Sequence, residues 1–519
     1  MKKNLKEKEK MFEKFTKKQI SILRKDTSNF FIGSPEAEAE STYVSKMKLN
    51  EVFEDYLDVL PKLQTEKFII TGRKGNGKSA IAENIHFLAD NDSQYFCDFI
   101  KKSDVDIEKI AQISKTADSS ITQELIIEWI ILIKFIKQLI ENQAISDEKE
   151  IKDLKIFLKK NSGFVDIKSN QIEEVLQSKG WEINVEYFKR FLTTKFGNKF
   201  DIKSSKAPFY KLLPHLKDTV RVLFRNIKNI DNNYILIFDD LDIGFHAKDK
   251  TNIDTILNII RVIKDYNISF FGKEAINAKI ILLLRSDISR ILLNQDADTA
   301  KIFSSYEIPL NWYEYNQLMN KEDDLHIKKF INKRISLNFK NNDFKYDKEK
   351  PWESLISEDD FYEKTSFKYV IDHTLIRPRD LILFFKPLPD LKFPIPLSVS
   401  NVNTLLGKYA IEFVKELRNE LTAHYCSDDI EAILKALSNS FSKSVSFKIF
   451  AEELNNFNFT DDAFDLCELL FDLSIIGNTS EDGNTYFKHW EKNDDIFKFN
   501  EKSNIITHFT LRNYLQGKR

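Results

Sequence analysis

Short apolar runs alternate along the chain with longer segments in which hydrophobic residues recur at helical spacing. Five of these runs have the length of a buried strand, and they lie at 68–71, 94–100, 235–238, 280–284 and 304–310. The segments between most of them place apolar residues three or four positions apart, as one face of a helix does. Strands that alternate with helices in this way predict a parallel sheet covered by helices on both faces.

The other segments are predicted to be mainly helical. Residues 1–25 have a lysine-rich amphipathic pattern, 46–60 form a helix that leads into the first strand, and 105–230 are a mostly helical insertion. Residues 386–396 hold four of the 11 prolines, which indicates a domain boundary. Beyond it, helices to about residue 473 and a β-hairpin predict a winged helix. The domains expected are an N-terminal helix and connector at 1–45, an α/β core at 46–320, a helical lid at 321–390 and a winged-helix-like domain at 391–519.

Composition narrows the classes of protein to which the chain can belong. Its 519 residues carry 78 basic and 80 acidic side chains, a balance that argues against a general nucleic-acid coat protein. The three cysteines are far apart and fit no zinc or disulfide spacing, which favours a reducing cytoplasm. Charged residues interrupt the most apolar segment before it reaches the length of a membrane span, so no membrane association is expected.

The stretch GRKGNGKS places three glycines within six residues of a chain that has only 13. Gly72, Gly77, Lys78 and Ser79 match the phosphate-binding pattern G-x-x-x-x-G-K-[ST], and the stretch follows a predicted strand and precedes a predicted helix. Lys78 would reach the terminal phosphates, and the Ser79 hydroxyl would hold Mg²⁺. An ordinary glycine turn capped by a helix is the alternative. The candidate nucleotide-binding residues are Gly72, Arg73, Lys74, Gly75, Asn76, Gly77, Lys78, Ser79 and Ala80.

A pair of acids, Asp239 and Asp240, follows the apolar run 235–238. The carboxyl end of a buried strand is where ligands bind in open α/β sheets. We therefore expect Asp239 to bind Mg²⁺, directly or through water, and Asp240 to polarise the attacking water. The alternative is a helix cap or an acidic turn, while Asp242 fits structural support and a neighbour contact equally well. Because an aspartate is shorter than a glutamate, nucleotide binding without hydrolysis also stays open.

Arginines supply further candidate catalytic residues. The strand at 280–284 ends in Arg285 and Asp287, either of which would lie near the γ-phosphate if this strand neighbours the one before Asp239. The alternative is a surface Arg–Asp pair. Arg290 and Arg334 are weaker candidates for an arginine finger offered to a neighbouring subunit.

The sequence RPRDL carries two more arginines, Arg377 and Arg379, on either side of Pro378. One guanidinium could bind the nucleotide from the lid, because its planar fork matches phosphate oxygens. The alternative is a helix start with Asp380 in the first turn.

The sequences GRKGNGKS, FDDLD, LLLRSD and RPRDL, followed by a winged-helix-like end, resemble those of prokaryotic STAND and KAP-like P-loop ATPases. That group is allied to the AAA+ and origin-recognition ATPases, and the resemblance spans roughly 45–515. It implies a P-loop NTPase sheet, with ATP and Mg²⁺ as cofactors, in a cytoplasmic homo-oligomer that serves antiphage defence. The chain lacks the transmembrane helices usual in KAP proteins, long sensor repeats and any nuclease, TIR or protease motif. A separate effector or sensor protein is therefore expected.

Three functions follow from this reasoning. The first is an ATP-binding and hydrolysing switch that oligomerises and regulates a partner effector. The second is a DNA-associated, origin-recognition-like ATPase, which is disfavoured because the expected recognition helix at 460–474 has five acidic residues and no lysine or arginine. The third is a scaffold that binds ATP without hydrolysing it.

Overall fold

In the computed structural model, the chain forms two compact units. The sheet unit comprises Asp58–Lys74 and Lys78–Leu310, and the helical unit comprises Met1–Leu57, Gly75–Gly77 and Asn311–Arg519. The structure describes residues 25–101, 122–141, 149–161, 182–196, 202, 204–226, 232–241, 245–295, 297–312, 321–359, 361, 364–440, 444–480, 483–488 and 498–516. The lysine-rich helix predicted at 1–25 lies almost entirely outside these residues.

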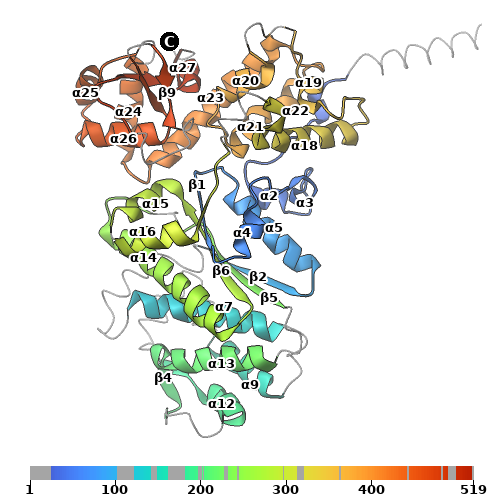
Figure 1. The fold of residues 1–519 in the computed structure, drawn as a ribbon, viewed down its shortest axis with the longest axis vertical. Coiled ribbons are helices and arrows are strands. Elements are labelled where there is room, and N and C mark those ends of the chain that lie inside the picture. The colour runs from blue at the N-terminus through green and yellow to red at the C-terminus, as the bar shows by residue number, and fades with distance from the viewer. Residues whose placement is uncertain are drawn as a thin grey trace, which may run out of the picture. The chain divides into compact units, whose positions relative to one another are not determined.

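A parallel sheet forms the centre of the sheet unit (Figure 1). Its five strands lie in the order β2-β5-β6-β1-β7, and every neighbouring pair is parallel. The strands are β1 (Ile69–Gly72), β2 (Tyr95–Ile100), β5 (Asn233–Phe238), β6 (Ala278–Arg285) and β7 (Glu307–Pro309). All five predicted strands and the parallel arrangement are confirmed.

The register of the sheet decides which residues share its carboxyl edge. Gly72 of β1 pairs with Arg285 of β6, and Phe238 of β5 pairs with Leu282 of the same strand. Because β6 lies between β1 and β5, it separates the glycine loop from the acidic pair by one strand. The three segments that follow β1, β5 and β6 therefore leave the sheet at the same edge.

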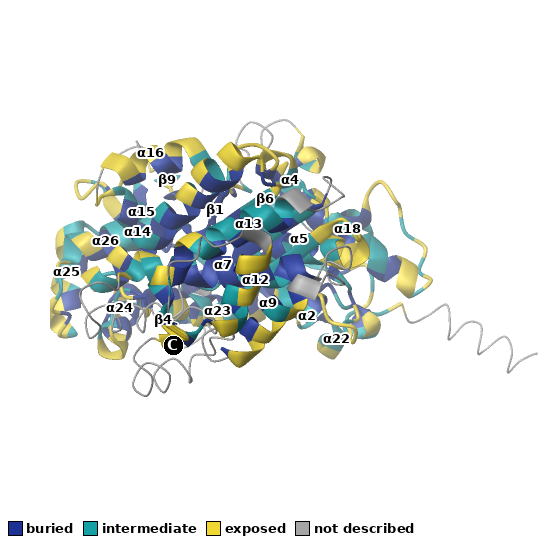
Figure 2. Ribbon diagram, turned by 90° about the horizontal axis from the view of Figure 1, so that it is seen from below, coloured by how far each residue is buried: buried dark blue, intermediate teal, exposed yellow. Residues whose placement is uncertain are grey.

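Helices cover both faces of the sheet. In Figure 1, α5 (Lys78–Asn91) lies on one side, while α14 (Lys250–Lys264), α15 (Ser286–Leu293) and α16 (Ala297–Tyr306) lie on the other. The helix α7 (Gln123–Glu141) packs against β2 and β5 and is buried along most of its described length (Figure 2). This burial accounts for its membrane-like composition. In the described part of the chain, no helix has the length and apolar character needed to cross a membrane.

The sheet unit contains further described elements. They are α4 (Val59–Leu63), α9 (Lys149–Lys160), the antiparallel strands β3 (Glu182–Asn184) and β4 (Lys206–Pro208), α12 (Glu186–Phe196) between those two strands, η2 (Phe209–Leu212), α13 (Leu213–Asn226) and the π-helix η3 (Asp265–Gly272). The described residues of the predicted insertion are thus mostly helical.

The single helix expected at 46–60 is wrong. A four-residue helix, α3 (Leu49–Val52), ends where Phe53 becomes extended, and α4 starts only at Val59. Asp58, immediately before α4, has a left-handed backbone with φ +52°. Both conformations interrupt the helical hydrogen-bond ladder, so hydrophobic spacing alone could not reveal the break.

The helical unit consists of a helical bundle and a winged-helix-like end. Its elements are η1 (Thr27–Asn29), α2 (Ala37–Glu40), α3, η4 (Glu322–Asp324), α18 (His326–Asn341), α19 (Pro351–Leu355), α20 (Ser366–Ile371), α21 (Pro378–Phe385), α22 (Leu388–Leu391), α23 (Val399–Leu421), α24 (Ser427–Ser440), α25 (Phe447–Asn456), α26 (Ala463–Asp472), β8 (Ile476–Thr479), β9 (Thr485–Tyr486), β10 (Asn504–Thr507) and α27 (Phe509–Gln516). The predicted hairpin is confirmed as β8 and β9, and β10 adds a third antiparallel strand beside β8.

A buried ion pair ties the N-terminal part of the helical unit to α18. Arg334 donates from Nη1 to Glu40 Oε1 at 2.6 Å and from Nη2 to Glu40 Oε2 at 2.8 Å. Its Nη1 also donates to the carbonyl of Ile32 at 3.0 Å. Both charged side chains are buried, so this ion pair joins α18 to α2 inside the helical unit. The interpretation of Arg334 as a finger extended to a neighbouring subunit is wrong, because the guanidinium is enclosed by its own chain.

Candidate nucleotide-binding site

The glycine loop has the local structure that its sequence predicts. It leaves β1 at Gly72 and enters α5 at Lys78. Gly75 and Gly77 have φ of +86° and +94°, a region that L-residues with a side chain rarely adopt. The strand, the bare-backbone turn and the start of a 14-residue helix thus follow one another directly. A helix N-terminus preceded by such a turn is a favourable place for an anion.

The side chain of Lys78 folds back over its own loop. Its Nζ donates to the carbonyl of Gly72 at 2.8 Å and to that of Arg73 at 3.2 Å. Ser79 and Ala80 follow in the first turn of α5, and both are half-buried. The ammonium group of Lys78 therefore lies at the start of the loop, while Ser79 belongs to the first turn of the helix that follows it.

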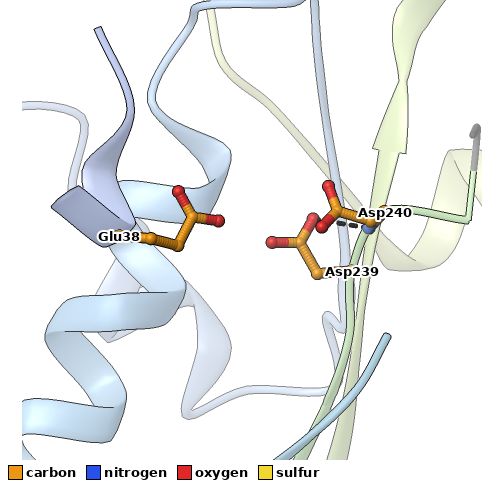
Figure 3. Close-up of side chains that lie close together, drawn as sticks. All are labelled: Glu38, Asp239 and Asp240. Carbon is orange, nitrogen blue, oxygen red and sulfur yellow. Dashed lines mark hydrogen bonds between the residues drawn. The ribbon is translucent and has the colours of Figure 1, made fainter. Parts of the chain in front are cut away.

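Asp239 comes directly after β5, and its side chain is only 4 % exposed. Its Oδ1 accepts a hydrogen bond from the main-chain N–H of Asp240 at 2.8 Å (Figure 3). Asp240 has φ +58°, and a non-glycine residue held in that region is uncommon and often marks a functional site. Glu38, also drawn in Figure 3, belongs to the helical unit. Asp242 lies outside the described residues.

Arg285 and Asp287 form a pair of their own at the end of β6. Arg285 Nε donates to Asp287 Oδ1 at 3.0 Å, and Nη2 donates to Oδ2 at 2.5 Å. The guanidinium is buried, so this pair is more enclosed than the surface pair considered as the alternative. A phosphate oxygen would have to compete with a bidentate carboxylate for Arg285. Arg290 lies in the last turn of α15 and is half-buried.

The two arginines of RPRDL have different surroundings. Arg377, the N-cap of α21, is 2 % exposed and donates twice to Asp380, at 3.0 Å and 2.8 Å, and once to Glu420, at 2.8 Å. Burial by itself would lower the pKa of Arg377, but the two carboxylates outweigh burial and raise that pKa well above its ordinary value. The structure therefore places Arg377 in the core of the helical unit.

Arg379 instead lies against the glycine loop. Its main-chain N–H donates to the carbonyl of Gly75 at 3.3 Å. A Cβ added to Gly75 would lie 2.9 Å from the Cβ of Arg379, so the two backbones approach as closely as glycine allows. Nε of Arg379 donates to the carbonyl of Pro35 at 2.9 Å, and Nη1 donates to Glu416 at 3.2 Å. Of the two predicted arginines, the structure brings only Arg379 to the loop.

Trp312 is a contact of the loop that the sequence did not indicate. It stands three residues after β7, and its indole Nε1 donates to the carbonyl of Asn76 at 2.9 Å. Asn76 itself is buried. A single aromatic residue after a strand belongs to no motif, and the two partners are 236 positions apart, so nothing in the sequence could connect them.

Comparisons with known proteins give a family match over part of the chain and similarity to solved structures. Residues 325–390, from the start of α18 into α22, match a FunZ-associated C-terminal helical domain. No curated protein matches the chain. A solved structure of the Aeropyrum pernix Orc1 protein in complex with DNA is 10 % identical, with a TM-score of 0.32 and 93 % of each chain covered.

Proposed function

We propose that this protein is an ATPase that binds Mg-ATP on the loop from Gly72 to Ser79. The single observation that supports it most is the order of the sheet. The glycine loop follows β1, Arg285 ends β6 and Asp239 follows β5, and these three adjacent strands deliver all of them to one edge. A phosphate chain on the loop would thus have cationic and acidic groups on the same side of the sheet.

The donor atoms suit a triphosphate and its metal. Successive main-chain amides and the N-terminus of α5 attract phosphate oxygens, and Lys78 adds a full positive charge. A phosphate is a stronger acceptor than the two neutral carbonyls that Lys78 now contacts. The Ser79 hydroxyl and the Asp239 carboxylate are hard oxygen ligands of the kind that Mg²⁺ prefers. Mg²⁺ would neutralise charge between the phosphates.

Asp240 is the proposed acid that orients the attacking water. Its left-handed backbone is held beside the Asp239 carboxylate by the hydrogen bond from its own N–H. That bond holds the Asp239 carboxylate against the backbone of Asp240, the residue that carries the proposed water-orienting group. If Asp240 is too short to reach the water, the protein binds ATP and acts as a scaffold without hydrolysing it.

ATP turnover and binding separate these possibilities. We expect the wild type to hydrolyse ATP and Lys78→Ala to lose at least about 100-fold in turnover, because a preorganised cation would be absent from the developing charge. Asp240→Asn should bind Mg-ATP normally but turn over poorly. Equal turnover in wild type and Lys78→Ala would refute the catalytic proposal. Binding by a wild type that never turns over would support the scaffold.

The cellular role rests on the resemblance to STAND and KAP-like ATPases. We propose a cytoplasmic homo-oligomer whose nucleotide state controls a separate effector or sensor, in antiphage defence. Deleting the gene in its native host should make at least one phage in a broad panel plate more efficiently, and an unchanged panel would contradict the role. A DNA-bound function is not favoured, because α26 presents acidic side chains and no basic one.

A further inference from the structure

We propose that Trp312 is a positioning residue of the phosphate loop: its indole N–H fixes the peptide plane whose amide would bind phosphate. The inference rests on the nucleotide site proposed above and assigns a role to a residue outside every motif. The ligand class is any compound carrying a di- or triphosphate, because the effect acts through main-chain amides and not through the base.

Two successive carbonyls of the loop accept hydrogen bonds from residues of the same unit, the helical unit. The carbonyl of Gly75 accepts from the Arg379 main-chain N–H at 3.3 Å, and that of Asn76 accepts from Trp312 Nε1 at 2.9 Å. The bond from Trp312 is the shorter of the two. Both acceptors belong to the stretch flanked by the left-handed glycines Gly75 and Gly77.

Because a peptide unit is planar, these contacts at the carbonyls also determine the directions in which the amide N–H groups point. In a trans peptide unit, the C=O and the N–H point in opposite directions. Among the described residues, the cis peptide bond lies elsewhere, between Ile395 and Pro396. Because the carbonyl of Asn76 points to Trp312, the N–H of Gly77 points away from it. By the same argument, the N–H of Asn76 points away from Arg379.

The two glycines make external hydrogen bonds necessary for a defined orientation of the peptide planes in the loop. Gly75 and Gly77 lack the side chain that would restrict φ, so the peptide planes around Asn76 could rotate at low cost without an external partner. A donor on the carbonyl side holds each plane in one orientation before phosphate arrives. The ordering entropy is then lost during folding and not during binding, which strengthens binding.

The indole itself is held in place by neighbouring rings. Its centroid lies 5.9 Å from that of Phe330 and 6.3 Å from that of Tyr56. Arg379 donates through its backbone, so no substitution removes that bond cleanly. Trp312 is therefore the one of these two donors that a substitution can remove while leaving the packing largely intact.

The test is isothermal calorimetry with Mg-ATP, Mg-ADP and adenosine on the full chain. Trp312→Phe keeps an aromatic ring between Tyr56 and Phe330 but loses the N–H donor. We expect it to bind Mg-ATP and Mg-ADP about three- to tenfold more weakly, as for one lost hydrogen bond, and to bind adenosine unchanged. Trp312→His, which retains a ring N–H, should bind Mg-ATP more tightly than Trp312→Phe.

A matched control is available in Trp352, whose buried indole Nε1 donates to Ser366 Oγ at 2.8 Å. Trp352→Phe also loses one indole hydrogen bond within the helical unit, so it should lower stability without changing the affinity for either nucleotide. Should Trp312→Phe fail to fold, indole ¹H–¹⁵N spectra of the wild type supply the answer. One of the five tryptophan signals should shift on addition of Mg-ADP.

The outcomes distinguish this inference from the proposed function. A wild type that binds no Mg-ATP overturns both. A wild type that binds Mg-ATP, a Lys78→Ala variant that does not, and a Trp312→Phe variant with wild-type affinity overturn the role of Trp312 alone. Weakening by Trp352→Phe as large as that by Trp312→Phe, or indole spectra in which no signal shifts, would also overturn it.

Discussion

At the residue scale, the glycine loop is constrained by contacts on its carbonyl side as well as by its backbone angles. Gly75 and Gly77 have nearly the same positive φ, yet their surroundings differ. A Cβ at Gly75 would meet the Cβ of Arg379, whereas a Cβ at Gly77 would meet nothing within 4 Å. Substitutions at these two glycines therefore distinguish the cost of backbone strain, which both positions have, from the cost of steric overlap, which arises only at Gly75.

Replacing each glycine with alanine should reveal this difference. Gly77→Ala is expected to cost about 1–2 kcal/mol in the free energy of unfolding, because of its left-handed backbone. Gly75→Ala should cost about 1–3 kcal/mol more, because the added methyl group overlaps Arg379. Denaturant unfolding without nucleotide measures both. Equal losses would show that the contact between Gly75 and Arg379 is not tight in solution.

At the element scale, the start of α21 concentrates charge in the core of the helical unit. Pro378 occupies its first turn, and Asp380 forms a capping box with the N-cap Arg377. The side chain of Arg377 then joins α21 to Glu420 on α23. A buried cation bound by two carboxylates leaves both anions uncompensated when it is removed.

Arg377→Ala should therefore destabilise the protein strongly. We expect a loss of about 3–5 kcal/mol in the free energy of unfolding. Arg379→Ala, two positions along and partly exposed, is the matched control and should cost about 1 kcal/mol. Thermal or denaturant unfolding distinguishes the two. If both variants lost the same stability, the buried ion pairs of Arg377 would not stabilise the helical unit more than the partly exposed contacts of Arg379 do.

The strand β6 has a lysine, Lys279, near its amino end. Lys279 donates to the carbonyls of Leu63 and Thr65, both at 2.5 Å, and so fixes the segment that leads into β1. Burial lowers the pKa of Lys279 to about 8, against a smaller opposing effect of Glu66. The charged form is thus less favourable in the folded state than in the unfolded chain.

This shift predicts the sign of a pH dependence. Between about pH 8 and the ordinary lysine pKa, the folded protein has released the proton while the unfolded chain still holds it. The contribution of Lys279 to stability should therefore rise with pH across that window. Unfolding free energies of the wild type and Lys279→Met should diverge in favour of the wild type from pH 7.5 to pH 10. A difference independent of pH would contradict the lowered pKa.

At the scale of the whole molecule, the chain forms two compact units, and its glycine loop contains residues of both. Gly75–Gly77 belong to the helical unit, while the residues on either side of them belong to the sheet unit. A ligand that binds the folded loop would stabilise the folded state of the loop relative to its unfolded state.

Mg-ATP should accordingly stabilise the protein against unfolding. At a free concentration 100 times the Kd, the gain is expected to be about 2.7 kcal/mol. Chelating the metal with EDTA should remove most of it, because Ser79 and Asp239 would then lose the ion that links them to the phosphates. Thermal unfolding with the Lys78→Ala variant is the control. Equal stabilisation of that variant would place the nucleotide elsewhere.

Features encoded by contiguous residues were predictable from the sequence. The five strands are apolar runs, and the glycine loop lies within one short stretch between a strand and a helix, so its local structure followed from those residues alone. The helix at 46–60 failed because its interruption depends on backbone conformations at Phe53 and Asp58 that hydrophobic spacing does not encode. The roles of the site residues and the domain boundaries stay predictions.

The sequence by itself determined the parallel α/β architecture and the phosphate-loop turn, because burial of apolar runs and glycine backbone freedom are local properties. Tertiary structure alone decided that β6 lies between the loop and Asp239, that Arg377 is buried while Arg379 meets Gly75, and that Trp312 bonds to Asn76. Those outcomes depend on which distant segments pack together. Two arginines of one short motif therefore differ, because the fold gives them different partners: Arg377 lies in the core, whereas Arg379 contacts the loop.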